Sequence, residues 1–253
     1  MTTVGFIGVG DLANYTIKGL RLGGYQNRIL LSPRNQGKSN LLAKECHCEV
    51  MVDNQAVVDA SNIIFISTRP EHCLETLAEI TLTSQHTLIS VVAGVSIDSL
   101  RSIVNPDIPI IRAMPVNCAE AGASPTLIYP DHDVVKSLFE YCGTAIAVEE
   151  ESAFENGSVL ACVYTWYFEL FEELIQATTS ASLPRKVATD LVLGMAKGAA
   201  SLATLDDKKT PGDIADFIAT EGTFSKLGLD LLKTRNAFQP WREACQLLND
   251  KLG

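Results

Sequence analysis

Residues 4–13 have the sequence VGFIGVGDLA, in which a short apolar run leads into two closely spaced glycines. The β-branched and aromatic residues at 4–7 predict a strand. The apolar residues that follow at helical spacing predict a helix that ends near Gly23. A second strand is predicted at 28–32. A strand, a glycine turn, a helix and a strand in this order form one βαβ unit.

The glycine turn fits the G-x-G-x-x-G/A fingerprint of dinucleotide-binding folds, with Ala13 in the third position. In that fingerprint Gly8 permits the tight turn, and Gly10 lets the backbone approach a pyrophosphate at the helix N-terminus. Glycines also mark ordinary turns, so the flanking strand and helix make the signal specific. We therefore predict dinucleotide binding. The predicted contacts in this turn are Gly8, Val9, Gly10, Asp11 and Leu12.

The end of the second strand decides which dinucleotide is expected. NAD sites place an Asp or Glu there, where it binds the ribose 2′-hydroxyl. No acidic residue occurs at 13–43, and the strand ends in the segment SPRN, with Ser32, Arg34 and Asn35, and Lys38 close behind. Arg34 can bind a phosphate through paired, charge-assisted hydrogen bonds, and Ser32 and Asn35 can add neutral ones. These residues favour NADP(H), and the alternative interpretation is a solvated basic loop.

Further apolar segments continue the alternation of strands and helices. Continuous apolar runs are typical of parallel strands that are covered on both faces. The additional strands are predicted at 63–66, 87–92, 108–112, 126–129 and 145–148. Pro70 fits the first turn of a helix between two of these strands, and Ser96 fits a helix N-cap. We predict an N-terminal doubly wound Rossmann domain over residues 1–150.

The remaining residues, 151–253, predict helices only. Apolar periodicity around 168–175 and after Pro184 indicates two long helices, and Pro211 with its following glycine is interpreted as an interruption before shorter ones. Long apolar helical faces need a partner, so we expect an all-α dimerisation domain. The fold class is therefore α/β with a helical C-terminal domain. The acidic run at 149–151 is interpreted as a solvated linker between the two domains.

The composition excludes several classes of protein. A content of 47% hydrophobic and 20% charged residues is typical of a packed chain, and a net charge of −10 disfavours nucleic acid as a partner. No apolar stretch is long enough to cross a bilayer, and the N-terminus lacks the basic region of a signal peptide, so we expect a cytoplasmic protein with no membrane partner. The seven cysteines fit reduced thiols. Residues 46–48 (CHC) resemble half a metal site, but no second ligand pair follows, and no metal is predicted.

Five short motifs match, in order, the pattern of one enzyme family. They are residues 5–10 (GFIGVG), 68–70 (TRP), 89–97 (ISVVAGVSI), 112–115 (RAMP) and 183–185 (LPR). These motifs resemble the pyrroline-5-carboxylate reductase family, whose pattern at these places is GFIGxGxMA, VKP, ISxxAGVSI, RxMPN and LPR. The third and fourth motifs in the correct order are more specific than the glycine turn alone.

The resemblance implies a helical domain that interlocks between two subunits, and hence a homodimer or a higher homo-oligomer. It implies reduction of a small cyclic imine, 1-pyrroline-5-carboxylate, to proline at the expense of NAD(P)H. It also implies cofactor contacts beyond the ends of the later strands. These contacts are Thr68, Arg69, Pro70, Ala93, Gly94 and Met114.

The substrate loop departs from the family pattern. The family segment SPGGTT, which receives the substrate carboxylate, is TEGTFS at 220–225 in this chain. Glu221 would place a like charge beside that carboxylate, so a related imine is an alternative substrate. The residues predicted to assist the reaction are Thr223, Ser225 and Glu221. Glu221 could attract a cationic iminium or relay a proton, and the alternative is an ordinary surface glutamate.

Two other functions stay open at this point. A relative that keeps the NADPH fold but has lost turnover would explain the altered loop. An oxidoreductase similar to the β-hydroxyacid dehydrogenases would share the glycine turn, but that family uses a lysine early in the helix between the domains, and residues 152–182 contain none.

Overall fold

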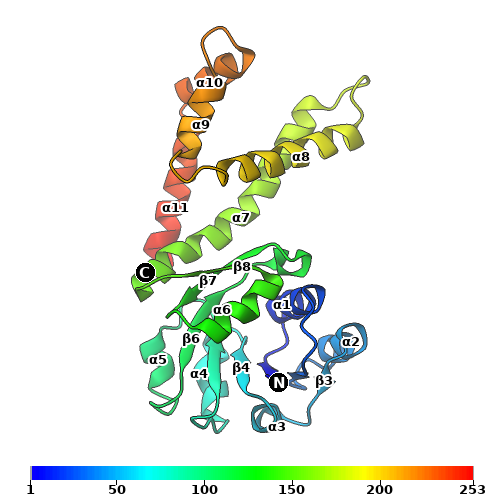
Figure 1. The fold of residues 1–253 in the computed structure, drawn as a ribbon, viewed down its shortest axis with the longest axis vertical. Coiled ribbons are helices and arrows are strands. Elements are labelled where there is room, and N and C mark those ends of the chain that lie inside the picture. Colours follow the sequence, from blue (N-terminus) through cyan, green and yellow to red (C-terminus); the bar gives the residue numbers. More distant parts are fainter. Residues whose placement is uncertain (1, 253) are drawn as a thin grey trace. The chain divides into compact units, whose positions relative to one another are not determined.

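The computed structural model describes residues 2–252, which form two compact units (Figure 1). The first unit runs to Ala161 and the second from Cys162 to Lys251. Helix α7 (Glu151–Thr178) begins in the first unit and continues into the second. The domain boundary at 150/151 therefore stays a prediction, placed where this helix begins.

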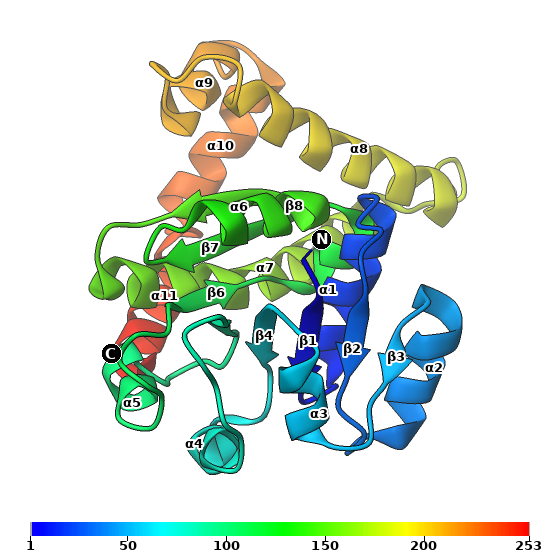
Figure 2. The ribbon, with the colours of Figure 1, turned by 60° about the horizontal axis from the view of Figure 1, so that its bottom comes forward.

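The first unit is built on one eight-stranded sheet in the order β3-β2-β1-β4-β5-β6-β7-β8 (Figure 2). Its strands are β1 (Val4–Ile7), β2 (Ile29–Leu31), β3 (Glu49–Val50), β4 (Ile63–Ile66), β5 (Thr87–Ser90), β6 (Ile110–Met114), β7 (Ser124–Tyr129) and β8 (Gly143–Ala147). All neighbouring strands pair in parallel except β6 and β7, which are antiparallel. The order reverses between β1 and β4, as a doubly wound fold requires. The predicted fold class is confirmed.

Helices cover both faces of this sheet. They are α1 (Asp11–Leu22), α2 (Gln36–Cys46), α3 (Asn54–Asp59), α4 (Pro70–Ala78), α5 (Ile97–Arg101) and α6 (Asp133–Phe139), with two short 3-10 helices at Asn117–Ala121 and Glu140–Cys142. One apolar cluster joins α1, α2 and α6 to one face, and a second joins α3, α4 and α5 to the other. Within β4, Phe65 packs in the first cluster and Ile64 in the second. This alternation explains why the strand is apolar throughout.

Local sequence signals place several helix ends correctly. Pro70 occupies the first turn of α4, and the Ser96 side chain accepts a hydrogen bond from the Ser99 amide at the start of α5. The apolar spacing of the sequence did not predict α2, α3 or α6. Helix α2 buries only Ser39, Leu42 and Cys46, so it lacks the broad apolar stripe that makes a helix recognisable.

The acidic run at 149–151 is more than the solvated linker expected from the sequence. Glu151 opens α7, and its carboxylate pairs with Arg112 of β6 at 2.8 Å and accepts the Ile97 amide of α5 at 2.8 Å. Arg112 is 1% exposed and also pairs with Glu155, one turn further along α7. The linker interpretation is therefore wrong for Glu151, because this residue anchors the start of α7 to the sheet.

The second unit contains helices and no strand among its described residues. Besides the later part of α7 it comprises α8 (Arg185–Ala203), α9 (Pro211–Ile218), α10 (Phe224–Thr234) and α11 (Gln239–Leu252). The expected interruption before shorter helices lies at residues 204–210, between α8 and α9, and Pro211 and Gly212 are not part of it. Pro211 lies in the first turn of α9, where Thr210 and Asp213 form a capping box, and a proline is favourable at that position because its missing N–H needs no partner.

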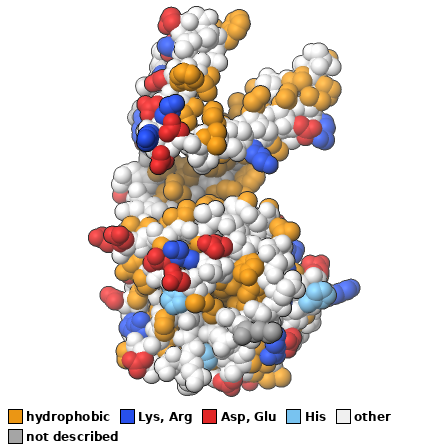
Figure 3. All heavy atoms as spheres, in the orientation of Figure 1, with side chains coloured by type: hydrophobic (Ala, Val, Ile, Leu, Met, Phe, Trp, Pro, Cys, Tyr) orange, Lys and Arg blue, Asp and Glu red, His pale blue; other side chains and the backbone are white. Residues whose placement is uncertain are grey.

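Apolar side chains of the second unit remain on its surface (Figure 3). Phe224 is 93% exposed, and Phe217 and Leu205 are each 80% exposed. Few of the described residues in this unit are buried, and they are Val163, Ile175, Ala188 and Ala219. A set of helices that exposes so much apolar surface needs a partner surface to cover it. None of the described helices is both long and apolar enough to cross a membrane.

Candidate cofactor and active site

The glycine turn between β1 and α1 is held in one conformation by its neighbours. Gly8 has a φ of 90°, and a Cβ at this position would lie 2.8 Å from the backbone carbonyl of Ser67. The Ser67 hydroxyl donates a hydrogen bond of 2.5 Å to the Gly8 carbonyl. Only glycine satisfies both the positive φ and the close approach of the two chain segments.

Gly10, unlike Gly8, borders open space on the side where a Cβ atom would lie. No heavy atom lies within 4 Å of the position that a Cβ would take at Gly10, and its φ is −96°. Gly10 is the N-cap of α1 and makes no side-chain capping bond, so the first amide groups of the helix face open space. Free amides and the positive end of the helix dipole suit an anion. The space beside Gly10 therefore fits the pyrophosphate of a dinucleotide.

The loop after β2 is bonded directly to this turn. Ser32 is fully buried, and its hydroxyl oxygen accepts the Gly8 amide at 3.0 Å. The Asn35 side-chain amide donates to the Val9 carbonyl at 3.1 Å, and its oxygen caps α2 by accepting the Lys38 amide. Arg34 is exposed beside them. The structure thus places the residues predicted for the ribose side of a cofactor next to the glycine turn.

The remaining predicted cofactor contacts lie at the carboxyl ends of the next strands. Thr68 and Arg69 follow β4, and Arg69 is the N-cap of α4. Ala93 and Gly94 follow β5 and are exposed, and Gly94 has a φ of 70° with no atom near its Cβ position. Met114 ends β6 and is half-buried. All six predicted residues thus share one edge of the sheet with Gly8 and Ser32, and their contacts to a cofactor stay a prediction.

The residues predicted to assist catalysis belong to the second unit, in the turn between α9 and α10. The Thr223 hydroxyl accepts the Lys226 amide at 3.2 Å and donates to the Thr220 carbonyl at 2.7 Å, so it caps α10. Glu221 and Ser225 are exposed. Gly222 between them has a φ of 81° and gives the turn its shape. The catalytic role of the three predicted residues stays a prediction.

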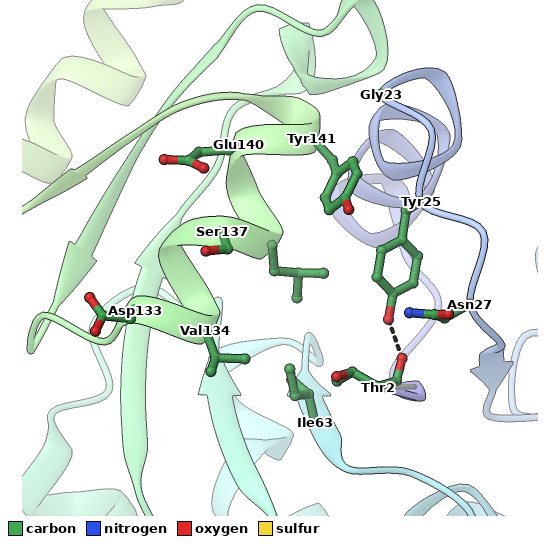
Figure 4. Close-up of a pocket in the computed structure, with 11 residues that line it drawn as sticks. Thr2, Gly23, Tyr25, Asn27, Ile63, Asp133, Val134, Ser137, Glu140 and Tyr141 are labelled. Atoms are coloured by element: carbon green, nitrogen blue, oxygen red, sulfur yellow. Dashed lines mark hydrogen bonds between the residues drawn. The ribbon is translucent and has the colours of Figure 1, made fainter.

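A cavity of about 640 Å³ lies elsewhere in the first unit (Figure 4). Thr2, Asn27 and Ile63 line it from the amino ends of the strands, opposite to the glycine turn. The rings of Tyr25 and Tyr141 meet edge to face at 5.4 Å in its wall, and the Tyr25 hydroxyl donates to the Thr2 carbonyl. Because doubly wound folds bind ligands at the carboxyl ends of their strands, this cavity is not the expected dinucleotide site.

The cysteines of the motif at 46–48 lie at the end of α2 and just before β3. Cys46 and Cys48 are buried, and burial raises the pKa of the Cys48 thiol to about 12, which keeps it protonated at neutral pH. No group of three or more potential ligands that could hold a metal occurs within residues 2–252.

Sequence reasoning missed three side chains that shape this region. Ser67 fixes the glycine turn, Lys38 pairs with Asp11 at 2.5 Å, and Arg112 anchors α7. Each contact joins residues that are far apart in the chain. The signals available were the basic residue close behind SPRN and the arginine of RAMP, but neither identifies its own partner.

Two family models match separate parts of the chain. Residues 3–94 match the model described as NADP oxidoreductase coenzyme F420-dependent. Residues 151–249 match the model described as pyrroline-5-carboxylate reductase dimerisation. The first matched segment contains the glycine turn and strands β1 to β5 of the sheet, and the second begins with α7 and reaches α11.

Curated relatives and solved structures agree with these matches. The pyrroline-5-carboxylate reductase of Corynebacterium melassecola is 24% identical, covering 100% of this chain and 99% of its own length. Pyrroline-5-carboxylate reductase 3 of Xenopus laevis is 27% identical, with coverage of 91% and 87%. The Plasmodium falciparum enzyme, solved with NADP bound, has a TM-score of 0.86 at 20% identity, covering 99% of this chain and 96% of its own. The Streptococcus pyogenes enzyme has a TM-score of 0.86 at 22% identity, with coverage of 99% and 98%, so the fold is shared throughout.

A Rossmann unit with a dinucleotide cradle, followed by a helical unit, defines a two-domain oxidoreductase that depends on a nicotinamide dinucleotide. The match of the helices to a dimerisation model, together with relatives that align over the whole chain, narrows this class. Over its whole length the chain is similar to pyrroline-5-carboxylate reductases, and residues 151–249 match the dimerisation model of that family.

Proposed function

We propose that this protein reduces the C=N bond of 1-pyrroline-5-carboxylate, or of a closely related cyclic imine, with NADPH. The open space at Gly10 beside the free amides of α1 supports the cofactor part of this proposal, and similarity to pyrroline-5-carboxylate reductases supports the reaction. A nicotinamide dinucleotide supplies the hydride when bound. Orientation and exclusion of water are the main tasks left to the protein, because a protonated imine is already electrophilic.

The preference for NADPH is supported by the loop after β2. Residues 13–43 contain no carboxylate that could bind a ribose 2′-hydroxyl. Arg34 is exposed next to Ser32 and Asn35, and these two are bonded to the glycine turn. A guanidinium at this position suits a 2′-phosphate through paired hydrogen bonds. Arg34 is therefore the main candidate for discriminating NADPH from NADH.

The reaction is tested by mixing the purified protein with NADPH and a panel of cyclic imines. The panel includes 1-pyrroline-5-carboxylate and the same ring without its carboxylate, and the absorbance of the reduced cofactor is followed. Oxidation is expected with at least one imine and more slowly when NADH replaces NADPH. A faster reaction of the ring without its carboxylate would identify the related substrate that the loop at 220–225 suggests.

The same assay decides between the two alternatives that the sequence left open. Binding of NADPH without oxidation by any imine would contradict the proposal and indicate a non-catalytic relative. Oxidation of a hydroxyacid in the presence of NADP⁺, without any reaction of imines, would indicate activity of the β-hydroxyacid dehydrogenase type. The cytoplasmic location expected from the sequence stays a prediction.

The assembly is proposed to be a homodimer that forms through the helices of the second unit. The dimerisation model covers residues 151–249, where Phe217 and Phe224 are exposed on helices and Leu205 is exposed in the segment between α8 and α9. Burial of such side chains against a second copy removes them from water. Light scattering after gel filtration is expected to give at least twice the mass of one chain. A monomeric mass at micromolar concentration would contradict the proposed assembly.

A further inference from the structure

An ion pair between Lys38 and Asp11 lies beside the glycine turn that is proposed to bind the dinucleotide. The Lys38 ammonium lies 2.5 Å from the Asp11 carboxylate, and the two side chains are 39% and 74% exposed. Asp11 begins α1 directly after Gly10, and Lys38 lies in the first turns of α2. The hydrogen bond from Asn35 to the Val9 carbonyl makes a second link between the same two segments. The ion pair therefore spans the gap between the glycine turn and the loop after β2.

The Asp11 carboxylate places a negative charge near the position proposed for the negatively charged phosphates of the cofactor. It is the acidic residue in the first turn of α1, next to the space left open at Gly10. A carboxylate at a helix N-terminus is favourable in the absence of a ligand, because it meets the positive end of the helix dipole. A phosphate that enters the same region meets a like charge. Lys38 neutralises Asp11 in the free protein.

Few donors after β2 remain available for a 2′-phosphate. The Asn35 side chain uses its oxygen to accept the Lys38 amide and one of its two N–H groups to bind the Val9 carbonyl, which leaves one N–H. The Ser32 oxygen accepts the Gly8 amide, which leaves its hydroxyl hydrogen. The two cations near the end of β2 are Arg34 in the loop and Lys38 in the first turn of α2. Lys38 is the one that the structure shows engaged with a carboxylate.

We propose that Lys38 is a specificity-determining residue for the cofactor, and that Asp11 holds it until the cofactor binds. This inference rests on the proposed use of NADP(H). A phosphate monoester carries nearly two negative charges at neutral pH and competes well against one carboxylate for the same ammonium. An exposed ion pair is weak enough to exchange partners. When NADP(H) binds, Lys38 passes from Asp11 to the 2′-phosphate, and Asp11 thereby lowers the affinity for NADP(H).

The test measures the affinities of NADP⁺ and NAD⁺ by calorimetry, without substrate or turnover. For Lys38→Met we expect NADP⁺ binding to weaken about tenfold, the loss of one charge-assisted hydrogen bond, with NAD⁺ changed less than threefold. For Asp11→Asn we expect the ratio of NADP⁺ to NAD⁺ affinity to rise about threefold or more, because Lys38 is then free. That rise should vanish in the double variant. Lys44→Met on the same helix and Asp98→Asn in the first turn of α5 are matched charge controls.

Several outcomes would overturn the inference. Equal weakening of NADP⁺ and NAD⁺ by Lys38→Met would mean that Lys38 only neutralises Asp11 beside the pyrophosphate. An unchanged affinity ratio in Asp11→Asn would mean that the pair is an ordinary surface contact. Arg34→Ala is expected to weaken NADP⁺ binding in the same experiment. This result would show that the 2′-phosphate binds at the loop after β2. A wild-type protein that binds neither nucleotide would instead contradict the proposed function itself.

Discussion

Replacing Arg112 by methionine is expected to lower the free energy of unfolding by about 3–5 kcal/mol, because the change leaves two carboxylates without their partner. Arg112 is 1% exposed and binds Glu151 and Glu155 through the same nitrogen, Nη1. The Phe154 ring lies 4.6 Å from the guanidinium carbon and covers its face. Because Glu151 also accepts the Ile97 amide, the loss reaches β6, α5 and the first turn of α7 together. Urea denaturation followed by circular dichroism measures the effect.

Two further variants identify the cause. Combining Arg112→Met with Glu151→Gln and Glu155→Gln removes the unpaired charges and is expected to recover a large part of the lost stability, because replacing a buried ion pair as a whole costs less than breaking it. Glu149→Gln changes an exposed acid of the same run and should have little effect. A loss below about 1 kcal/mol for Arg112→Met would show that the cluster contributes no more than a surface ion pair.

Gly8→Ala is expected to destabilise the first unit by about 2–5 kcal/mol, the combined cost of a strained positive φ and of overpacking. The added Cβ would lie 2.8 Å from the backbone of Ser67 and 2.9 Å from the Thr68 amide nitrogen, and neither is the end of a flexible side chain that could move aside. The change also displaces the Gly8 amide from the Ser32 hydroxyl. Denaturation and dinucleotide titration of the same preparation should show that both stability and binding are lost.

Gly10→Ala is the matched control for Gly8→Ala, two residues further along the same turn. Its backbone φ of −96° suits alanine, and the Cβ position is empty. Stability should change by no more than about 1 kcal/mol, the usual difference between glycine and alanine at an N-cap. Dinucleotide affinity should still fall at least tenfold, since the methyl group occupies the space proposed for the pyrophosphate. An unchanged dinucleotide affinity of Gly10→Ala would contradict the proposal that the pyrophosphate binds beside Gly10.

Predictions that depended on neighbouring residues in the sequence agree with the structure better than predictions that depended on contacts between distant residues. The glycine turn and the acid-free stretch at 13–43 are local, and the structure keeps the residues that they identified, Ser32 and Asn35, bonded to the turn. The role of Pro211 was misjudged because the sequence suggested only a break, whereas Thr210 and Asp213 form a capping box around it. The linker interpretation of the acidic run was wrong for Glu151 because its partner, Arg112, is 39 residues earlier in the chain.

The sequence by itself determined most strands of the sheet, the glycine turn with the helix that follows it, and the helical C-terminal half, because apolar spacing and glycine positions act over a few residues. Only the tertiary structure decided that Ser67 holds Gly8, that Asp11 binds Lys38 and that Arg112 anchors α7. The partners in these contacts are 59, 27 and 39 residues apart. No local pattern encodes such pairs, since the strand order and the packing of the helices bring them together.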